Sequence, residues 1–208
     1  MPSCIRSITN NCFNQCSSLS FIKLPSSVES IEENAFCDCK LLKEITLNSA
    51  LTIIDKCAFK GCISLTKVLY DFPSSIITIS VSAFENCSSL TQIFFPSSLK
   101  FIEKYAFNGC SGLKEVYFEP NSKLLSIGEN SFSKCSSLKK VFIPETINEI
   151  GISEFKGCIS LENLVIPSSV EHIDEDAFEG CLSLKKITLP SNIEHMLKLP
   201  LGVQKTLI

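Results

Sequence analysis

Hydrophobic residues recur along the chain with a period of 23 to 25 residues. The clearest marker is a phenylalanine, found at Phe13, Phe36, Phe59, Phe84, Phe107, Phe132, Phe155 and Phe178. In every unit an isoleucine stands five residues before this phenylalanine, a cysteine three residues after it and a leucine six residues after it. Apolar residues nine and eleven positions after it show the period of two that is typical of a short strand. A fixed period of this length indicates a repeat protein.

Energetics predict that the units stack. One unit offers about seven core side chains, worth ~1.5–3 kcal/mol each when buried, whereas ordering its residues costs on the order of 1.5 kcal/mol apiece. Only burial of equivalent positions against one another recovers this deficit. We therefore predict a single right-handed solenoid domain over residues 1–208, with eight repeats over about 5–195 and a degraded partial ninth coil at 196–208. Each repeat is expected to add one short strand to a parallel β-sheet, with short helical or 3-10 turns on the other side.

Three details refine this prediction. Two positions after each phenylalanine the residue is mostly Gly, Asn or Asp, which favours a left-handed backbone conformation there. The two 25-residue units carry their extra residues after the strand, at 70–73 and 118–121, where we expect surface turns that disturb no stacked column. Glu154 stands where most other units have a small alanine, and it predicts a locally distorted seventh coil.

These residues carry a resemblance. The unit Ile-x4-Phe-x2-Cys-x2-Leu-x2-Ile-x-Leu-Pro-Ser-Ser-Val-x2-Ile resembles the BspA-type leucine-rich repeat, and the similarity extends from Ile5 to Met196. The fixed Phe, Cys and Leu positions distinguish it from a generic leucine-rich repeat. The resemblance implies a leucine-rich repeat solenoid that acts in adhesion or binding, on the surface of anaerobic bacteria and protists or secreted by them.

The cysteines are the second unusual feature, 12 in all. Eight of them are in register, and we expect them to form an interior ladder in which each S–H reaches a backbone carbonyl. Parallel Cβ directions along such a ladder oppose disulfide geometry. Buried thiols suit a reducing compartment, and the first six residues lack the apolar stretch of a signal peptide. These observations favour the cytoplasm, whereas the family resemblance implies the cell surface or secretion.

Composition restricts the classes of function that this protein can have. Lys+Arg 19 against Asp+Glu 22 gives a net charge of −3, so no basic field attracts nucleic acid. Apolar runs are far shorter than the roughly twenty residues of a membrane span. Because every chemically active residue type occurs in repeated positions rather than in a singular constellation, we expect no catalytic residue, no enzyme activity and no cofactor.

One ladder of polar residues is a weak metal candidate. His172 and His195 are 23 residues apart, and Glu149 stands one coil earlier in the same column. Imidazole and carboxylate groups in one column could hold a metal ion of a metal-dependent enzyme or respond to pH. The alternative is that these are exposed residues at an unconstrained position.

The outward-facing strand positions carry the main functional prediction. Ten residues after each phenylalanine, the middle units present Leu69, Phe94, Tyr117, Phe142 and Val165. We call this set the apolar stripe; exposed patches of this kind tend to mark partner sites. The polar column two residues earlier forms a rim that includes Lys67, Gln92, Glu115 and Lys140. The alternative is that neighbouring aromatic and β-branched side chains only strengthen the sheet.

The sequence therefore predicts a noncatalytic scaffold that binds a protein, or a glycan, on the exposed face of its sheet. An intracellular regulatory scaffold is the alternative. Lysines at 43, 114, 139 and 185 line the start of the strands, where they either keep the sheet soluble or form an anion site. Because neither end of the repeat array carries a polar cap, either end-to-end self-association or partial fraying of the ends is a further expectation.

Overall fold

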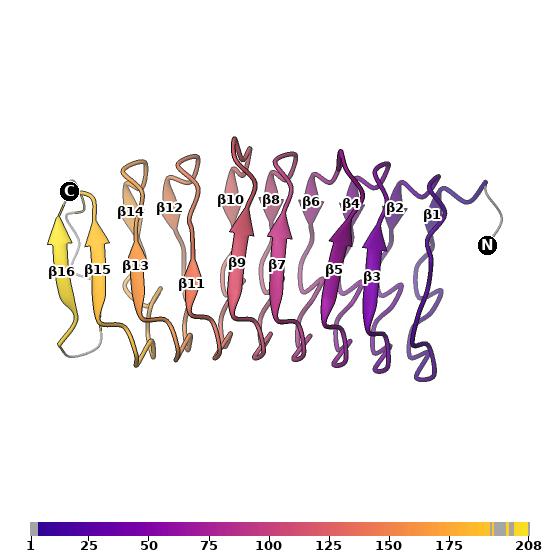
Figure 1. Ribbon diagram of the computed structural model, residues 1–208, viewed down its shortest axis with the longest axis horizontal. Coiled ribbons are helices and arrows are strands. Elements are labelled where there is room, and N and C mark those ends of the chain that lie inside the picture. Colours follow the sequence, from indigo (N-terminus) through magenta and orange to yellow (C-terminus); the bar gives the residue numbers. More distant parts are fainter. Residues whose placement is uncertain (1–3, 192, 194–198, 200–201, 208) are drawn as a thin grey trace.

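The chain forms a parallel β-solenoid of about eight turns (Figure 1). This computed structural model describes residues 4–191, 193, 199 and 202–207. Each turn is called a coil here and is numbered by its phenylalanine, from Phe13 in coil 1 to Phe178 in coil 8. The predicted solenoid is thus confirmed.

The predicted strand appears along one wall in coils 2 to 8 and once more after coil 8, whereas residues 21–24 of coil 1 form no strand. These strands are β3 (Glu44–Leu47), β5 (Lys67–Tyr70), β7 (Gln92–Phe95), β9 (Glu115–Phe118), β11 (Lys140–Val141), β13 (Asn163–Val165), β15 (Lys186–Leu189) and β16 (Gln204–Leu207). They pair in parallel, but not as the single sheet that the sequence predicts. Hydrogen bonding divides them into β3-β5, β7-β9-β11 and β13-β15-β16.

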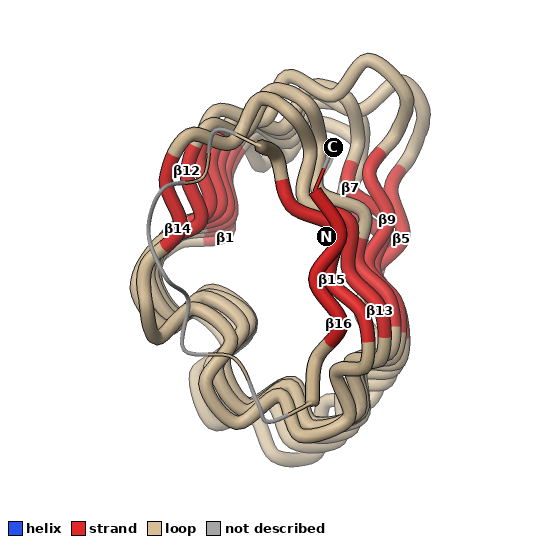
Figure 2. Tube along the Cα trace, turned by 90° about the vertical axis from the view of Figure 1, so that its left-hand side faces the viewer, coloured by secondary structure: helices blue, strands red, loops and turns tan. Residues whose placement is uncertain are grey.

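A second column of strands, which the sequence analysis missed, lines the opposite wall (Figure 2). Its members are two residues long and each ends on the isoleucine that precedes the phenylalanine: β1 (Ser7–Ile8), β2 (Ser30–Ile31), β4 (Ile53–Ile54), β6 (Thr78–Ile79), β8 (Phe101–Ile102), β10 (Ser126–Ile127), β12 (Glu149–Ile150) and β14 (His172–Ile173). The first six form one sheet, and β12 pairs only with β14. Two residues are too few to produce a recognisable alternation.

The predicted helical and 3-10 turns are wrong for the described part of the chain, which contains neither. The segment around each phenylalanine consists of separate turns, such as Cys12 N–H to Thr9 C=O and Cys16 N–H to Phe13 C=O. Left-handed residues separate them, and a helix cannot propagate through this conformation. The predicted left-handed column is confirmed in all eight coils, at Gln15, Asp38, Gly61, Asn86, Gly109, Lys134, Gly157 and Gly180.

The core is built from columns of identical side chains. The phenylalanine rings stack with centroids 5.1 Å apart between coils 1 and 2, widening to 5.8 Å between coils 7 and 8. The cysteine ladder is confirmed, because in coils 2 to 8 each thiol donates to the carbonyl of the phenylalanine one coil earlier. In the middle of the ladder Cys110 Sγ lies 3.1 Å from the Phe84 oxygen.

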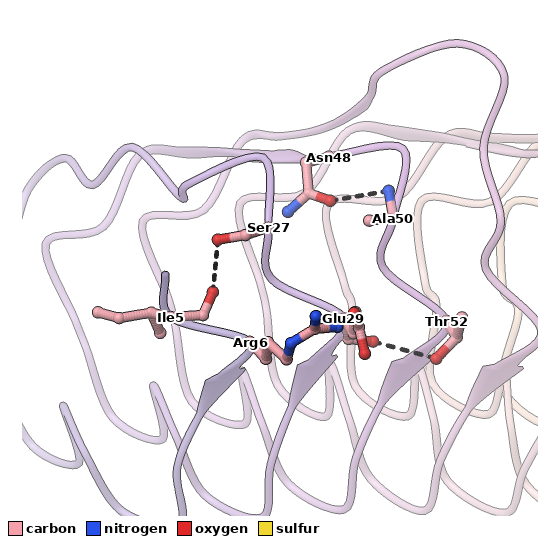
Figure 3. Close-up of polar contacts among 7 residues, drawn as sticks. All are labelled: Ile5, Arg6, Ser27, Glu29, Asn48, Ala50 and Thr52. Atoms are coloured by element: carbon pink, nitrogen blue, oxygen red, sulfur yellow. Dashed lines mark hydrogen bonds and ion pairs between the residues drawn. The ribbon is translucent and has the colours of Figure 1, made fainter. Parts of the chain in front are cut away.

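Polar side chains continue the stacking at the turns. In the turn Pro25-Ser26-Ser27, Ser27 Oγ donates to the Ile5 carbonyl at 2.6 Å (Figure 3). In the following unit, Thr52 Oγ1 donates to the Glu29 carbonyl at 3.0 Å. Asn48 closes the neighbouring turn by accepting the Ala50 N–H. Each coil therefore uses side-chain hydrogen bonds to satisfy the backbone of its neighbour.

The extra residues of the two longer units lie on the surface as predicted, with Phe72 86% exposed. The first insertion nevertheless coincides with the interruption between β5 and β7, whereas β9 and β11 remain paired across the second. At the far end, β16 pairs with β15 and places Leu207 opposite Leu189. A 23-residue register would have placed Leu207 in the column of Leu184. The same register would place Met196 in the isoleucine column and Leu201 in the phenylalanine column, but both residues lie outside the described ones.

Candidate binding face and the opening between coils 6 and 7

The apolar stripe lies on the outer face of the wall formed by β3, β5, β7, β9, β11, β13 and β15, which are called the long strands here to distinguish them from the column that begins with β1. Phe94 is 52% exposed, Phe142 65% and Val165 62%, while Leu69 is exposed and Tyr117 half-buried. Their exposure follows from strand alternation, because the residues on either side of each point into the core. Phe94 and Tyr117 stack across β7 and β9, with ring centroids 4.7 Å apart. This stack is the most ordered part of the stripe.

The predicted rim is polar as expected. Lys67, Gln92 and Lys140 are exposed, and Glu115 is half-buried. The Tyr117 hydroxyl donates to Glu115 Oε2 at 2.6 Å, and this hydrogen bond raises the pKa of Tyr117 above its ordinary value. The carboxylate thereby fixes one edge of the aromatic stack.

Within the stripe, a hollow lies between β11 and β13, where the two strands do not pair. Its volume is about 440 Å³. The lining consists of Lys140, Val141, Phe142, Ile143, Glu145, Asn163, Val165 and Pro167. The sequence pattern identified Phe142 and Val165 in the stripe and Lys140 and Asn163 in the polar column beside it, but not the other lining residues, because an unbroken sheet was expected.

The opposite wall is open at the same place. β10 and β12 do not pair, and a smaller hollow of about 240 Å³ lies between them, with Ile127, Glu149 and Gly151 in its lining. Of the seven junctions between coils 1 and 8, only this one interrupts both strand columns. The hydrogen bonds of the phenylalanine turns hold the two coils together, including Phe132 N–H to the Glu154 carbonyl at 3.0 Å.

Glu154 lies at this junction and is fully buried in the alanine column. Its Oε2 accepts the Gly151 N–H at 2.9 Å, whereas Oε1 has no partner. Burial raises the pKa of the Glu154 carboxyl well above its ordinary value; the Gly151 N–H opposes this shift and Glu149 adds to it. One coil earlier in the same column, the buried Ser131 hydroxyl also lacks a partner. The distortion predicted from Glu154 is therefore present in coil 7.

The weak metal candidate is only partly visible. Glu149 and His172 lie opposite each other on β12 and β14, and His195 lies outside the described residues. Within the described part of the chain, no three His, Cys, Asp or Glu side chains come together as metal ligands do. Glu149 and His172 are cross-strand neighbours, and both side chains are exposed.

The buried cysteines are poor nucleophiles. Burial raises the pKa of the Cys39 thiol to about 11 and that of Cys110 to about 12. A thiol in this state is almost entirely protonated at neutral pH, and the thiolate is the reactive form. The ladder therefore has a structural role in the core.

A parallel solenoid with a column of strands along one wall and a buried leucine column is the architecture of a leucine-rich repeat protein. The chain belongs to the BspA-type leucine-rich repeat family, whose profile matches six copies over residues 6–124 and 117–198. No curated protein is similar enough in sequence to match this chain. Among the residues that the structure describes, no helix has the length and apolar character needed to cross a membrane.

Solved structures share the fold. A leucine-rich repeat protein of T. pallidum is 25% identical, with a TM-score of 0.55 over 79% of this chain and 72% of its own. One from Eubacterium ventriosum is 24% identical, with a TM-score of 0.58 over 86% of this chain and 41% of its own. A leucine-rich cell surface protein of Faecalibacterium prausnitzii is 26% identical, with a TM-score of 0.49 over 93% of this chain and 65% of its own. The chain thus spans less than two thirds of the length of two of these proteins.

Proposed function

We propose that this protein is a noncatalytic binding scaffold that recognises a protein ligand through the apolar stripe. The observation that carries the proposal is the exposure of Phe94, Phe142 and Val165, each by more than half, in one line across coils 4, 6 and 7. Aromatic side chains of this kind are enriched at the centre of protein interfaces, with polar residues around them. Membership of a repeat-scaffold family agrees with this role.

The rigidity of the face also supports binding. The Phe94 and Tyr117 rings are stacked and the Tyr117 hydroxyl is fixed by Glu115. Side chains that are ordered before binding lose little conformational entropy when a ligand arrives. Adhesion is the form of this function that the family resemblance implies, and the ligand is then a protein of another cell or surface.

The proposal is tested by selecting ligands from a displayed library of random peptides. Phe94→Lys combined with Phe142→Lys places two charges in the stripe, and peptides selected on the unsubstituted protein should lose at least about 30-fold in affinity, or about 2 kcal/mol. The melting temperature should stay nearly unchanged, since exposed substitutions usually cost less than about 0.5 kcal/mol.

A matched control introduces the same two positive charges on another face of the protein. Ile159→Lys combined with Leu182→Lys alters two exposed hydrophobic residues outside the long strands, and these peptides should bind it normally. Equal affinity for both double variants would contradict the proposal, as would recovery of an oligosaccharide ligand but no peptide. Light scattering at several concentrations tests self-association, which would identify a second copy as the ligand.

The thiols favour an intracellular regulatory scaffold as the second candidate. Seven cysteines are buried and reduced, and the other five are also free. Such a core is best maintained in a reducing compartment. Localisation of the tagged full-length protein separates the two candidates, because a surface signal supports adhesion and a cytosolic signal supports regulation.

A metal-dependent enzyme at Glu149, His172 and His195 is the third function that the sequence allows. Metal analysis of the purified protein tests it. Stoichiometric metal that disappears when both histidines are replaced would support this function over a binding role.

A further inference from the structure

The opening between coils 6 and 7 has a local cause in the backbone hydrogen bonds. At the other six junctions, the N–H four residues before the phenylalanine donates to the isoleucine carbonyl of the preceding coil, at 2.7–2.9 Å. Gly128 N–H donates to Ile102 and Asp174 N–H to Ile150 in this way. In coil 7 the equivalent N–H belongs to Gly151, and it donates to the Glu154 carboxyl instead of to Ile127. Glu154 therefore removes one inter-coil bond from the wall formed by the short strands.

Further bonds are lost on both walls of this junction. Glu171 N–H donates to the Asn148 carbonyl, but Asn148 N–H makes no equivalent bond to Leu125. On the long-strand wall, Lys139 N–H donates to Lys114, whereas the amide of residue 162 makes no equivalent bond to residue 139. The phenylalanine rings on either side are 5.7 Å apart, close to the 5.8 Å at the next junction, where both strand columns pair, so the ring column does not open with the walls. The coils separate on both walls while the turns hold them.

The hollow at this opening has the size and surface of an anchor site. Its volume of about 440 Å³ falls within the roughly 300–1,000 Å³ of small-ligand pockets. Phe142 and Val165 form exposed walls, and Val141 and Ile143 present buried apolar surface. Interfaces obtain most of their binding energy from a few aromatic or aliphatic side chains seated in such hollows. It is also continuous with the apolar stripe, because Phe142 and Val165 belong to both.

The charges around the hollow differ between its two ends: lysines lie at the start of the strands, whereas Glu145 lines the other end. Lys140 lines the hollow, and Lys139 and Lys114 lie on adjacent positions at the start of the strands. All three are exposed, and in the described part of the chain none has an acidic side chain within ion-pair distance. The nearby Glu162 is already paired with Lys185. Unpaired lysines beside an apolar hollow complement an acidic ligand.

We propose that this hollow is the anchor subsite of the binding face, and that it takes one aromatic or aliphatic side chain from a partner protein segment whose residues facing the lysines are acidic. The proposal rests on the binding function proposed above. Lys140, Lys139 and Lys114 contact the acidic residues of the segment. Glu154 is a positioning residue that keeps the subsite open without touching the ligand.

The experiment uses three capped tripeptides, Asp-Phe-Asp, Lys-Phe-Lys and Asp-Ala-Asp, titrated into the ¹⁵N-labelled full chain. The acidic phenylalanine peptide should shift the amide signals of residues 140–145 and 163–167. Lys-Phe-Lys should bind at least about fivefold more weakly, as expected for the loss of an exposed ion pair, and Asp-Ala-Asp should leave these signals unchanged. Equal affinity for the acidic and basic peptides, or shifts located elsewhere, overturns the proposal.

Two variants test the charged groups and separate this proposal from the proposed function. Lys140→Glu should reverse the preference, so that Lys-Phe-Lys binds more tightly than Asp-Phe-Asp. Ile159→Lys lies outside the hollow and outside the apolar stripe, and it should leave tripeptide affinity unchanged. If Lys140→Glu has no effect while library peptides still require Phe94, the function stands and the subsite fails. If the tripeptides bind but library peptides ignore Phe94, the subsite stands and the stripe fails.

The role of Glu154 is tested with a pair of substitutions. Glu154→Ala frees the Gly151 N–H to bond with Ile127, so Gly151 amide exchange should slow at least tenfold and tripeptide affinity should fall. Glu154→Gln retains an acceptor for this N–H, and it should preserve both the fast exchange and the affinity. Equal tripeptide affinity in the alanine and glutamine variants overturns the positioning role.

Discussion

The buried carboxyl of Glu154 makes the stability of the protein dependent on pH. Its pKa is raised in the folded state, first by burial and then by Glu149. The neighbours in its own column, Ser131 and Ala177, carry no charge, so nothing there compensates an ionised form. A carboxyl with a raised folded-state pKa contributes stability that is fully present below its ordinary pKa and is lost as the pH rises towards the folded value. Unfolding should therefore become easier as the pH rises above 4.5.

The magnitude follows from linkage. Between the ordinary pKa and the folded-state pKa, each pH unit should cost about 1.4 kcal/mol of unfolding free energy. For a chain of this length, this corresponds to a fall of about 3–6 °C in melting temperature per pH unit. Glu154→Gln has nearly the same shape and cannot ionise, so its melting temperature should lack this component.

The assay compares melting temperatures of the two proteins by circular dichroism at half-unit intervals from pH 4 to pH 8. The gap between them should widen with rising pH. Glu171→Gln changes an exposed carboxylate, and its profile should run parallel to that of the unsubstituted protein. Parallel profiles for Glu154→Gln as well would refute the assignment of a buried, protonated carboxyl to coil 7.

Two further predictions concern the repeated columns. Seven buried cysteines should resist a thiol reagent at pH 8 while the exposed Cys4 and Cys12 react first, because burial raises the pKa of the ladder thiols; mass spectrometry counts the labelled thiols, and rapid labelling of Cys110 would contradict the fold. Lys134 has φ 61° in the column where Gly109 has φ 72°, so Lys134→Gly should raise the unfolding free energy by about 1 kcal/mol and Gly109→Ala should lower it by at least as much. A Cβ on Gly109 would also lie 2.3 Å from Asn86 Oδ1. Denaturant titration measures both variants, and changes of the same sign would contradict the left-handed assignment.

The comparison between coils 6 and 7 and the other junctions shows where sequence reasoning stops. Glu154 in the alanine column was a visible irregularity, and it predicts a distorted coil. The sequence does not reveal which bond changes, because Gly151 and Ile127 are ordinary members of their columns and become competitors only when the coils stack. The hollow lies at the same junction, and its lining residues Glu145 and Pro167 could not be assigned to a site beforehand.

The short strands ending at isoleucines such as Ile54 are a different kind of omission. A two-residue strand has no period of its own, and it exists only because the neighbouring coil supplies its partner. The left-handed column shows the opposite case. Glycine at residues 61 and 109 indicates this backbone conformation directly, and stacking imposes it even on Lys134.

The sequence by itself determined the periodic part of this protein. The phenylalanine, cysteine and leucine columns, the outward stripe and the position of each coil follow from spacing, because equivalent residues in a solenoid have the same environment. The tertiary structure decided what varies between coils: the division of the sheet, the second wall of short strands and the hollow beside Phe142. These features depend on backbone hydrogen bonds between neighbouring coils, and such bonds form only when the coils are in contact.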